Sequence, residues 1–169
     1  MLGFAIRYGI WVGSLFFLVF FEGLSPFFIV NQLQTELTIS ITQLWVSGFD
    51  LPVRLQADTL LLANGLHLKI LHECNGLTPF LLLLAAILAY PTFWKSKIQW
   101  VLIGYFALLA INTLRMLLVT LVVIDHPDLF HIVHDWIGRY SIALLTVGLF
   151  FLYTHYVEVI KPIRSDLSD

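Results

Sequence analysis

Long apolar stretches separated by short polar turns dominate the chain and predict helices that span a membrane. A bilayer core of roughly 30 Å needs about 20 apolar residues at a rise of 1.5 Å per residue. Four stretches are long enough: Tyr8–Val30, Cys74–Trp94, Ile98–Ile124 and Tyr140–Val157. We therefore predict one all-α, polytopic membrane domain over residues 1–169, with about four transmembrane helices.

The segment between the first two stretches, residues 31–73, is predicted to be an extracytoplasmic insertion. Apolar residues recur at helical spacing from residue 33 to 46, which predicts a helix that could lie on the membrane surface. Asn64 and Gly65 stand between two apolar runs, which is typical of a β-hairpin. The second outer segment runs from Asp125 to Arg139, and residues 161–169 form a polar cytoplasmic tail.

Basic residues in short loops indicate the orientation, because cytoplasmic loops carry the excess of Lys and Arg. Placing the N-terminus inside assigns five of them to the cytoplasmic side and three to the outside; the five are Arg7, Lys95, Lys97, Lys161 and Arg164. We therefore expect both termini to be cytoplasmic in a protein integral to the cytoplasmic (inner) membrane.

Composition supports the membrane class and excludes several others. Hydrophobic residues make up 59% of the chain and charged residues only 12%, whereas a soluble domain is about a quarter charged. The net charge is −2 and no basic block is present, so we expect no nucleic-acid partner. The single cysteine, Cys74, excludes an intrachain disulfide and a CxxC motif.

The few chemically active residues of the spans are predicted to meet at one depth. Ionisable groups inside a membrane are costly and therefore suggest function. Arg115 lies 17 residues into the third stretch, roughly 25 Å from its start. Cys74 begins the second stretch and His134 precedes the fourth, so all three fall near the outer boundary. Glu22, in the first stretch, is expected to support the site or to pair with Arg115.

Together these residue types suit acyl transfer. A cysteine thiolate is a nucleophile, a histidine can take and return its proton, and a guanidinium can stabilise the thiolate or an oxyanion. Gly76 would let a substrate backbone approach closely. Each residue also has a purely structural alternative: Cys74 as a small buried side chain, Arg115 as an outward-reaching cation and the histidines as solvated groups.

Three sequence islands resemble the exosortase and archaeosortase family of membrane transpeptidases. They are Glu73-Cys74-Asn75-Gly76-Leu77, Asn112-Thr-Leu-Arg115-Met and His131-Ile-Val-His134-Asp-Trp-Ile-Gly138. The similarity covers about residues 50–157. In its small size the chain looks most like the short exosortases sometimes labelled type H.

The resemblance implies a cysteine protease or transpeptidase with Cys74, Arg115 and His134 as its catalytic residues. Alternates are His131, Arg139 and Glu73, and the supporting residues are Asn75, Gly76, Asn112 and Glu22. The implied partners are membrane-anchored proteins ending in a short motif, a transmembrane helix and a basic tail, which are cleaved outside the membrane and passed to an acceptor. No cofactor or metal is required. The substrate helix could dock at small residues such as Gly104.

Two other functions are compatible with the sequence. His72, Glu73, Cys74, His131 and His134 are all acceptable zinc ligands, although the HExxH pattern of zinc proteases is absent. A zinc-dependent membrane hydrolase is one alternative. The other is a non-catalytic assembly or transport subunit in which Glu22 and Arg115 pair two helices.

Overall fold

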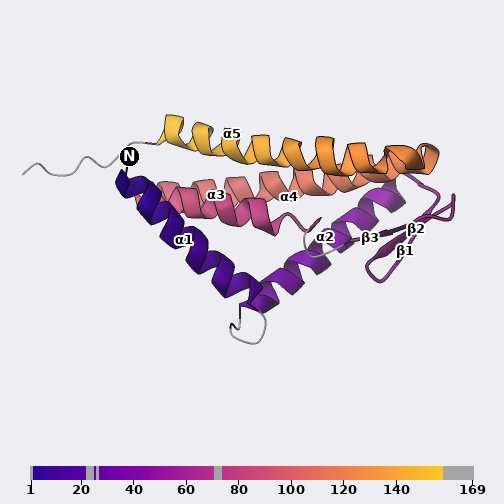
Figure 1. Ribbon diagram of the computed structural model, residues 1–169, viewed down its shortest axis with the longest axis horizontal. Helices are drawn as coiled ribbons and strands as arrows, with labels where there is room; N and C mark the ends of the chain where they lie inside the picture. Colours follow the sequence, from indigo (N-terminus) through magenta and orange to yellow (C-terminus); the bar gives the residue numbers. More distant parts are fainter. Residues whose placement is uncertain (1, 22–24, 26, 71–73, 158–169) are drawn as a thin grey trace, which may run out of the picture.

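The computed structural model describes residues 2–21, 25, 27–70 and 74–157. Helices form most of this part of the chain, and a small sheet is inserted between the second and third (Figure 1). The helices are α1 (Leu2–Phe20), α2 (Phe28–Gly48), α3 (Leu77–Ala89), α4 (Trp94–Asp125), the short η2 (Pro127–Leu129), the π-helix η3 (Ile132–Arg139) and α5 (Tyr140–Tyr156). The strands are β1 (Val53–Gln56), β2 (Thr59–Leu62) and β3 (His67–Lys69).

Three helical stretches within the described residues are long and apolar enough to cross a membrane: α1, α4 and Ile132–Tyr156. The chain is therefore a polytopic all-α membrane protein, as predicted. The second predicted span, Cys74–Trp94, is shorter than expected. Helix α3 has 13 residues and is therefore about 20 Å long, because the first three predicted residues form the turn that holds Cys74 and the helix already ends at Ala89.

The long axis of the molecule follows α4, with α3 and α5 beside it (Figure 1). Helices α1 and α2 together form a V whose two arms lie along opposite halves of this axis. Helix α1 packs on α3, and α2 packs on α4. The start of α1, the turn between α3 and α4 and the end of α5 lie at the same end of the molecule. Cys74, at the start of α3, consequently lies near the middle of the long axis.

Helix α2 confirms the helix predicted from residue 33 to 46, but it turns a polar face inward. Its buried residues are Asn31, Gln34, Thr35, Thr38, Thr42 and Val46, whereas Leu33 and Leu44 of the predicted apolar stripe are 57% and 71% exposed. The predicted first span, Tyr8–Val30, is wrong at its end, because α1 stops at Phe20 and Val30 belongs to α2. Hydropathy carries the first span into α2, because that helix begins with the apolar residues Phe28, Ile29 and Val30.

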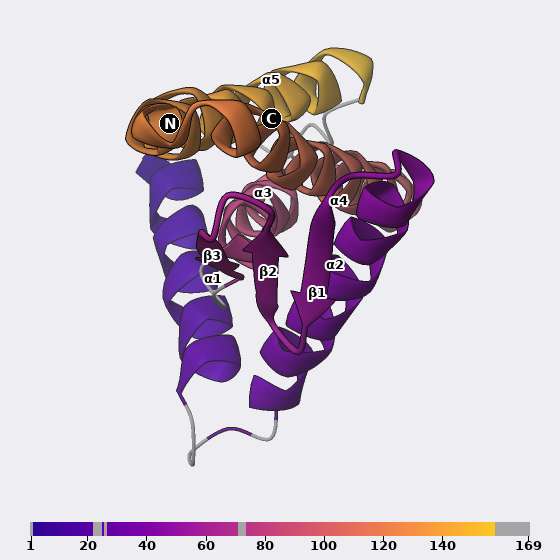
Figure 2. The ribbon, with the colours of Figure 1, turned by 90° about the vertical axis from the view of Figure 1, so that its right-hand side faces the viewer.

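The predicted hairpin is confirmed as β2 and β3, with Gly65 at φ +85° in its turn. Strand β1, which was not predicted, pairs with the other edge of β2 to give the antiparallel order β1-β2-β3 (Figure 2). The apolar face of the sheet packs on the C-terminal part of α4, and Leu60 of the sheet and Val123 of α4 are fully buried in this contact. Asn64 fastens the hairpin turn to the end of α4 by donating to Val123 O at 2.9 Å.

The predicted outer segment from Asp125 to Arg139 is wound into η2 and η3, and η3 continues into α5. His131 and His134 therefore lie in a helix and not in a loop. A π-helix has wider turns than an α-helix, and such turns are frequent at functional sites. Only the fourth predicted span, Tyr140–Val157, agrees closely with its helix, α5.

Candidate active site

A tight turn presents Cys74 just before α3. Gly76 has φ +77° and is the N-terminal flanking residue of this helix, a backbone conformation that glycine adopts without strain. A Cβ atom at Gly76 would lie 3.1 Å from Asn112 Cγ of α4. Asn112 uses this close approach to donate from Nδ2 to the Cys74 carbonyl at 2.8 Å. The structure thus brings together Cys74 and the predicted supporting residues Gly76 and Asn112.

Asn75 anchors the same turn to α2. Its Nδ2 donates to Asn31 Oδ1 at 2.7 Å and to Thr35 Oγ1 at 2.9 Å. Its Oδ1 accepts from the backbone N–H of Leu77 at 2.9 Å. This network explains the polar inward face of α2, because buried polar groups need partners.

The residues that α2 contributes to this network were not predicted from the sequence. Gln34 Nε2 and Thr38 Oγ1 donate to the Asn75 carbonyl at 3.1 and 3.2 Å, and Gln34 Oε1 accepts from Tyr105 of α4 at 2.8 Å. The polar residues of α2 recur every three or four positions, so their spacing could have indicated an inward polar face.

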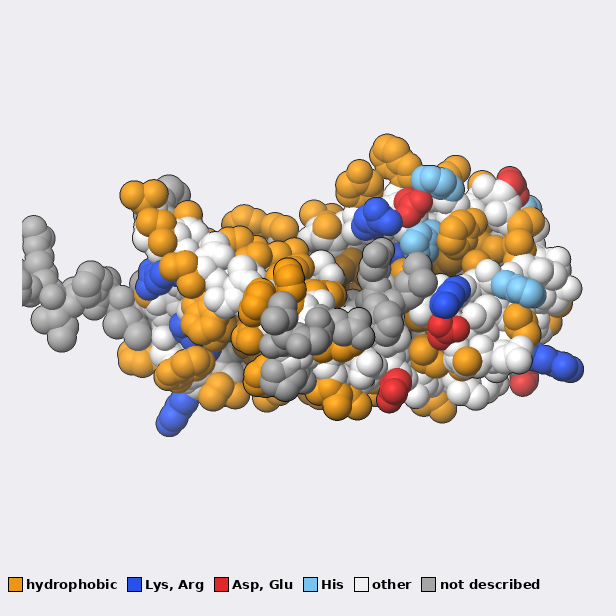
Figure 3. Space-filling view, turned by 60° about the horizontal axis from the view of Figure 1, so that its bottom comes forward, with side chains coloured by type: hydrophobic (Ala, Val, Ile, Leu, Met, Phe, Trp, Pro, Cys, Tyr) orange, Lys and Arg blue, Asp and Glu red, His pale blue; other side chains and the backbone are white. Residues whose placement is uncertain are grey.

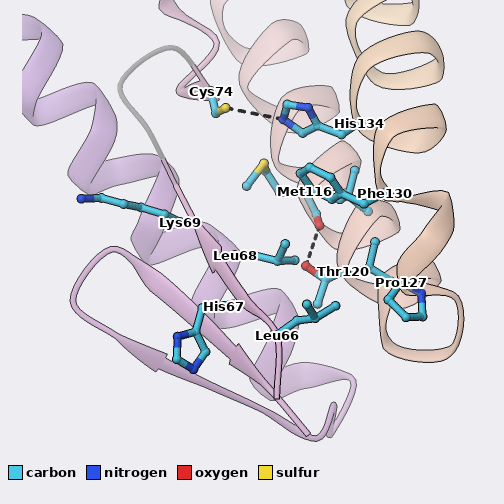
Figure 4. Close-up of a pocket in the computed structure, with 12 residues that line it drawn as sticks. Leu66, His67, Leu68, Lys69, Cys74, Met116, Thr120, Pro127, Phe130 and His134 are labelled. Atoms are coloured by element: carbon cyan, nitrogen blue, oxygen red, sulfur yellow. Dashed lines mark hydrogen bonds between the residues drawn. The ribbon is translucent and has the colours of Figure 1, made fainter. Parts of the chain in front are cut away.

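Cys74 faces His134 across the site. Cys74 Sγ lies 3.7 Å from His134 Nε2 (Figure 4). The other ring nitrogen, Nδ1, lies 3.0 Å from Asp135 Oδ1. An ionised carboxylate can only accept, so Nδ1 carries the proton in this contact and the Nε2 lone pair is directed at the thiol. Asp135 had no predicted role, although it directly follows His134 in the sequence.

Asp135 also contacts the two alternates from the same helical segment. Its Oδ2 lies 3.0 Å from His131 Nδ1, and its Oδ1 accepts from Arg139 Nη2 at 3.0 Å. The His131 side chain is 78% exposed, against 19% for His134. Of the two predicted candidates for the base, the structure places His134 against the thiol and His131 behind the carboxylate.

Arg115 reaches the site from α4. Its Nη2 donates to the His134 carbonyl at 3.3 Å, and the side chain packs against Gly138, where a Cβ atom would lie 3.1 Å from Arg115 Cδ. Arg115 Nε is buried, with no hydrogen-bond acceptor among the described residues. A buried donor of this kind costs free energy unless something accepts from it, so a group entering the site could satisfy it.

Two predicted site residues, Glu22 and Glu73, lie outside the described residues, as does His72 of the zinc alternative. Within the part of the chain that is described, no group of three or more His, Cys, Asp or Glu side chains is arranged to hold a metal ion.

A groove of about 900 Å³ runs from this site along the half of the protein that holds α1. Its walls come from α1, α3, α4 and α5, with Phe4 at one extreme and Cys74, Arg115 and His134 at the other. On the face shown in Figure 3, hydrophobic side chains gather over the half that holds α1, and the acidic and histidine side chains lie in the other half. The site therefore lies where the apolar half meets the polar half.

The site lies about one bilayer thickness along α4 from the start of that helix. Asn112, which contacts the Cys74 carbonyl, lies 18 residues after Trp94 at the start of α4. This separation corresponds to about 27 Å along the helix, close to the thickness of a bilayer core of roughly 30 Å. The sheet and the last turns of α4 extend beyond this level.

Comparison with known protein families agrees with this arrangement. The family described as transmembrane exosortase matches residues 2–152, which cover both arms of the V, the sheet and all of the site residues above. No curated protein and no solved structure matches the chain. The small size of the chain fits the short type H exosortases. On the extent of the family match, this protein belongs to the transmembrane exosortases.

Proposed function

We propose that the protein is a membrane-embedded cysteine transpeptidase that cleaves C-terminal sorting signals of exported proteins on the outer face of the cytoplasmic membrane. The observation that carries the proposal is the 3.7 Å approach of Cys74 Sγ to His134 Nε2 at the outer end of a membrane-embedded groove. The groove also contains Arg115, a permanent cation.

In the first half-reaction His134 Nε2 takes the Cys74 thiol proton, and the thiolate attacks the scissile carbonyl carbon. The tetrahedral intermediate collapses as the C–N bond breaks, and His134 returns the proton to the leaving amine. The product is a thioester between Cys74 and the exported protein. In the second half-reaction an amine, hydroxyl or water of the acceptor attacks this thioester and regenerates the thiol.

Arg115 and Asp135 assist these steps through different parts of His134: Arg115 contacts its carbonyl and Asp135 its ring. The guanidinium stabilises the thiolate and the developing oxyanion, and its unsatisfied Nε donor gives it capacity for a further acceptor. Asp135 is a positioning residue, because it holds the His134 ring with Nε2 toward the thiol. Arg139 and His131 hold Asp135 in turn.

The membrane-embedded groove suits the transmembrane helix of a substrate. It is lined mainly by apolar and aromatic side chains from α1, α3 and α5, including Phe4, Leu82 and Phe151. Gly104, the docking point suggested by the sequence, is not available. It is buried, and a Cβ atom there would lie 2.6 Å from Leu83 Cδ2, so this small residue serves the packing of α4 on α3.

The orientation follows from the basic residues at the far end of the groove. Arg7 of α1 and Lys95 and Lys97 of α4 belong to the end that holds the start of α1 and the α3–α4 turn. By the excess of basic residues on the cytoplasmic side this end is cytoplasmic, and Cys74 faces the extracytoplasmic side.

The test is cleavage of a tagged exported protein that ends in an apolar helix and a basic tail, encoded by the same genome. Cys74→Ala is expected to abolish cleavage while the enzyme still accumulates in membranes. His126→Ala, which removes an exposed histidine after α4, serves as the matched control and should cleave normally. Continued cleavage by Cys74→Ala would overturn the proposal, and stoichiometric zinc in the purified protein would favour the hydrolase alternative.

A further inference from the structure

A second cavity, of about 320 Å³, opens on the other side of Cys74, under the outer edge of the sheet. We propose that this cavity and the free edge of β3 bind the extended peptide segment that precedes the scissile bond, as an added β-strand with apolar side chains toward α4. The inference rests on the proposed function and names how its substrate is recognised.

Among the described residues, no strand pairs with the outer edge of β3. Strand β3 lies at the margin of the sheet, with β2 as its neighbour. Leu66 O accepts from Leu62 N at 2.9 Å, and Ile70 N donates to Asp58 O at 2.8 Å. In an antiparallel pair, alternate residues direct their backbone groups to the same side. The N–H and C=O groups of His67 and Lys69 therefore point away from β2.

This free edge borders the cavity. The four consecutive residues Leu66–Lys69 all line it, although alternate side chains of a strand point to opposite faces. Leu66 and Leu68 point toward α4, and His67 and Lys69 point away from it (Figure 4). A strand that lines a cavity with all of its residues does so with its edge, which is where another strand would add.

The cavity wall opposite β3 is mainly apolar. It consists of Met116, Val119, Thr120 and Val123 of α4 together with Pro127 and Phe130. An added strand beside β3 would direct every second side chain into this space. The expected chemistry is therefore an extended segment with an apolar residue at the positions that face α4, and tolerance at the positions between.

Continuity with the site identifies the occupant. Cys74 and His134 line both this cavity and the membrane-embedded groove, so the thiol lies at their junction. A substrate helix in the groove continues through the scissile bond into the cavity. The chain on the outer side of that bond is the segment that precedes the helix, and the free edge of β3 is the backbone nearest to it along the cavity.

The first test uses the purified enzyme in lipid nanodiscs and synthetic sorting tails with single N-methyl groups before the scissile bond. N-methylation removes one backbone donor. A peptide paired to β3 should lose about tenfold in cleavage rate at alternate positions, the loss of one hydrogen bond, and little at those between. Equal losses at all positions, or none, would overturn strand addition. A wild-type enzyme that cleaves none of the tails would instead count against the proposed function.

The second test changes the enzyme. His67→Pro removes an N–H that points away from β2 and breaks no hydrogen bond to that strand. Edge strands tolerate proline at such a position. His67→Ala controls for the loss of the side chain. We expect His67→Pro to cleave about tenfold more slowly than His67→Ala, which keeps the N–H. The N-methyl alternation should persist in His67→Pro, because proline keeps the C=O that accepts from the peptide. Leu66→Glu should slow cleavage of those sorting tails that place an apolar residue beside position 66. An unchanged rate in His67→Pro together with an unchanged side-chain preference in Leu66→Glu, with intact Cys74-dependent cleavage, would refute strand addition at β3 and leave the proposed function standing.

Discussion

Gly138 in η3 offers a sharp perturbation of the site, because Arg115 packs directly against it. A Cβ atom at Gly138 would meet Arg115 Nε and would lie 3.0 Å from Val133 O and 3.1 Å from Arg115 Cδ. Carbon atoms in ordinary contact are about 3.5–4.0 Å apart. In Gly138→Ala the guanidinium must therefore shift by roughly 1 Å, and a displacement of this size can cost about 100-fold in rate.

Gly148→Ala is the matched control, since it lies in α5 and no described atom comes within 4 Å of its added Cβ. Both variants are compared for accumulation in membranes and for single-turnover cleavage of the tagged sorting-tail protein. We expect Gly138→Ala to cleave about 100-fold more slowly and Gly148→Ala to cleave at the wild-type rate. Equal rates in the two variants would refute the placement of Arg115 at the reacting atoms.

Three other changes probe the same site. Asp135→Asn can present an amide N–H to His134 Nδ1 and so favour the wrong tautomer of the ring. In a Ser-His-Asp triad the same Asp-to-Asn change lowers kcat by about 10⁴-fold, so we expect the cleavage rate to fall at least 100-fold and its pH profile to change. An unchanged pH profile would exclude the positioning role. Arg115→Lys should accumulate normally but cleave poorly, because Lys lacks the planar donor set; near-normal cleavage would favour a simple charge-pair role. Asn75→Ala removes the donor to Asn31 Oδ1 and the acceptor of the Leu77 N–H, which should lower stability by roughly 2–4 kcal/mol, measured as a fall in the thermal unfolding midpoint in detergent.

The membrane class, the hairpin and the convergence of Cys74, Arg115 and His134 could be predicted because each depends on local pattern or on depth. Span length and loop position place these three residues at one level whatever the packing. The boundary between α1 and α2 could not be found by hydropathy, because the first residues of α2, Phe28, Ile29 and Val30, continue the apolar run of α1.

The role of Asp135 escaped prediction for a different reason. Its contact with the neighbouring His134 occurs within the π-helical turn, and no sequence spacing marks such a turn. Strand β1 was not predicted because Val53–Gln56 alternates apolar and polar residues over only four positions. Four positions are too few for a two-residue period to identify a strand.

The proposed reaction requires Cys74 to form a thioester with the exported protein. The most direct measurement is mass spectrometry of the enzyme, quenched in acid shortly after mixing with the tagged sorting-tail protein. We expect the Cys74-containing peptide to carry the mass of the substrate's new C-terminal segment, and hydroxylamine to release it. Cleavage of the substrate with Cys74 unmodified at every time point would contradict a reaction through this thioester.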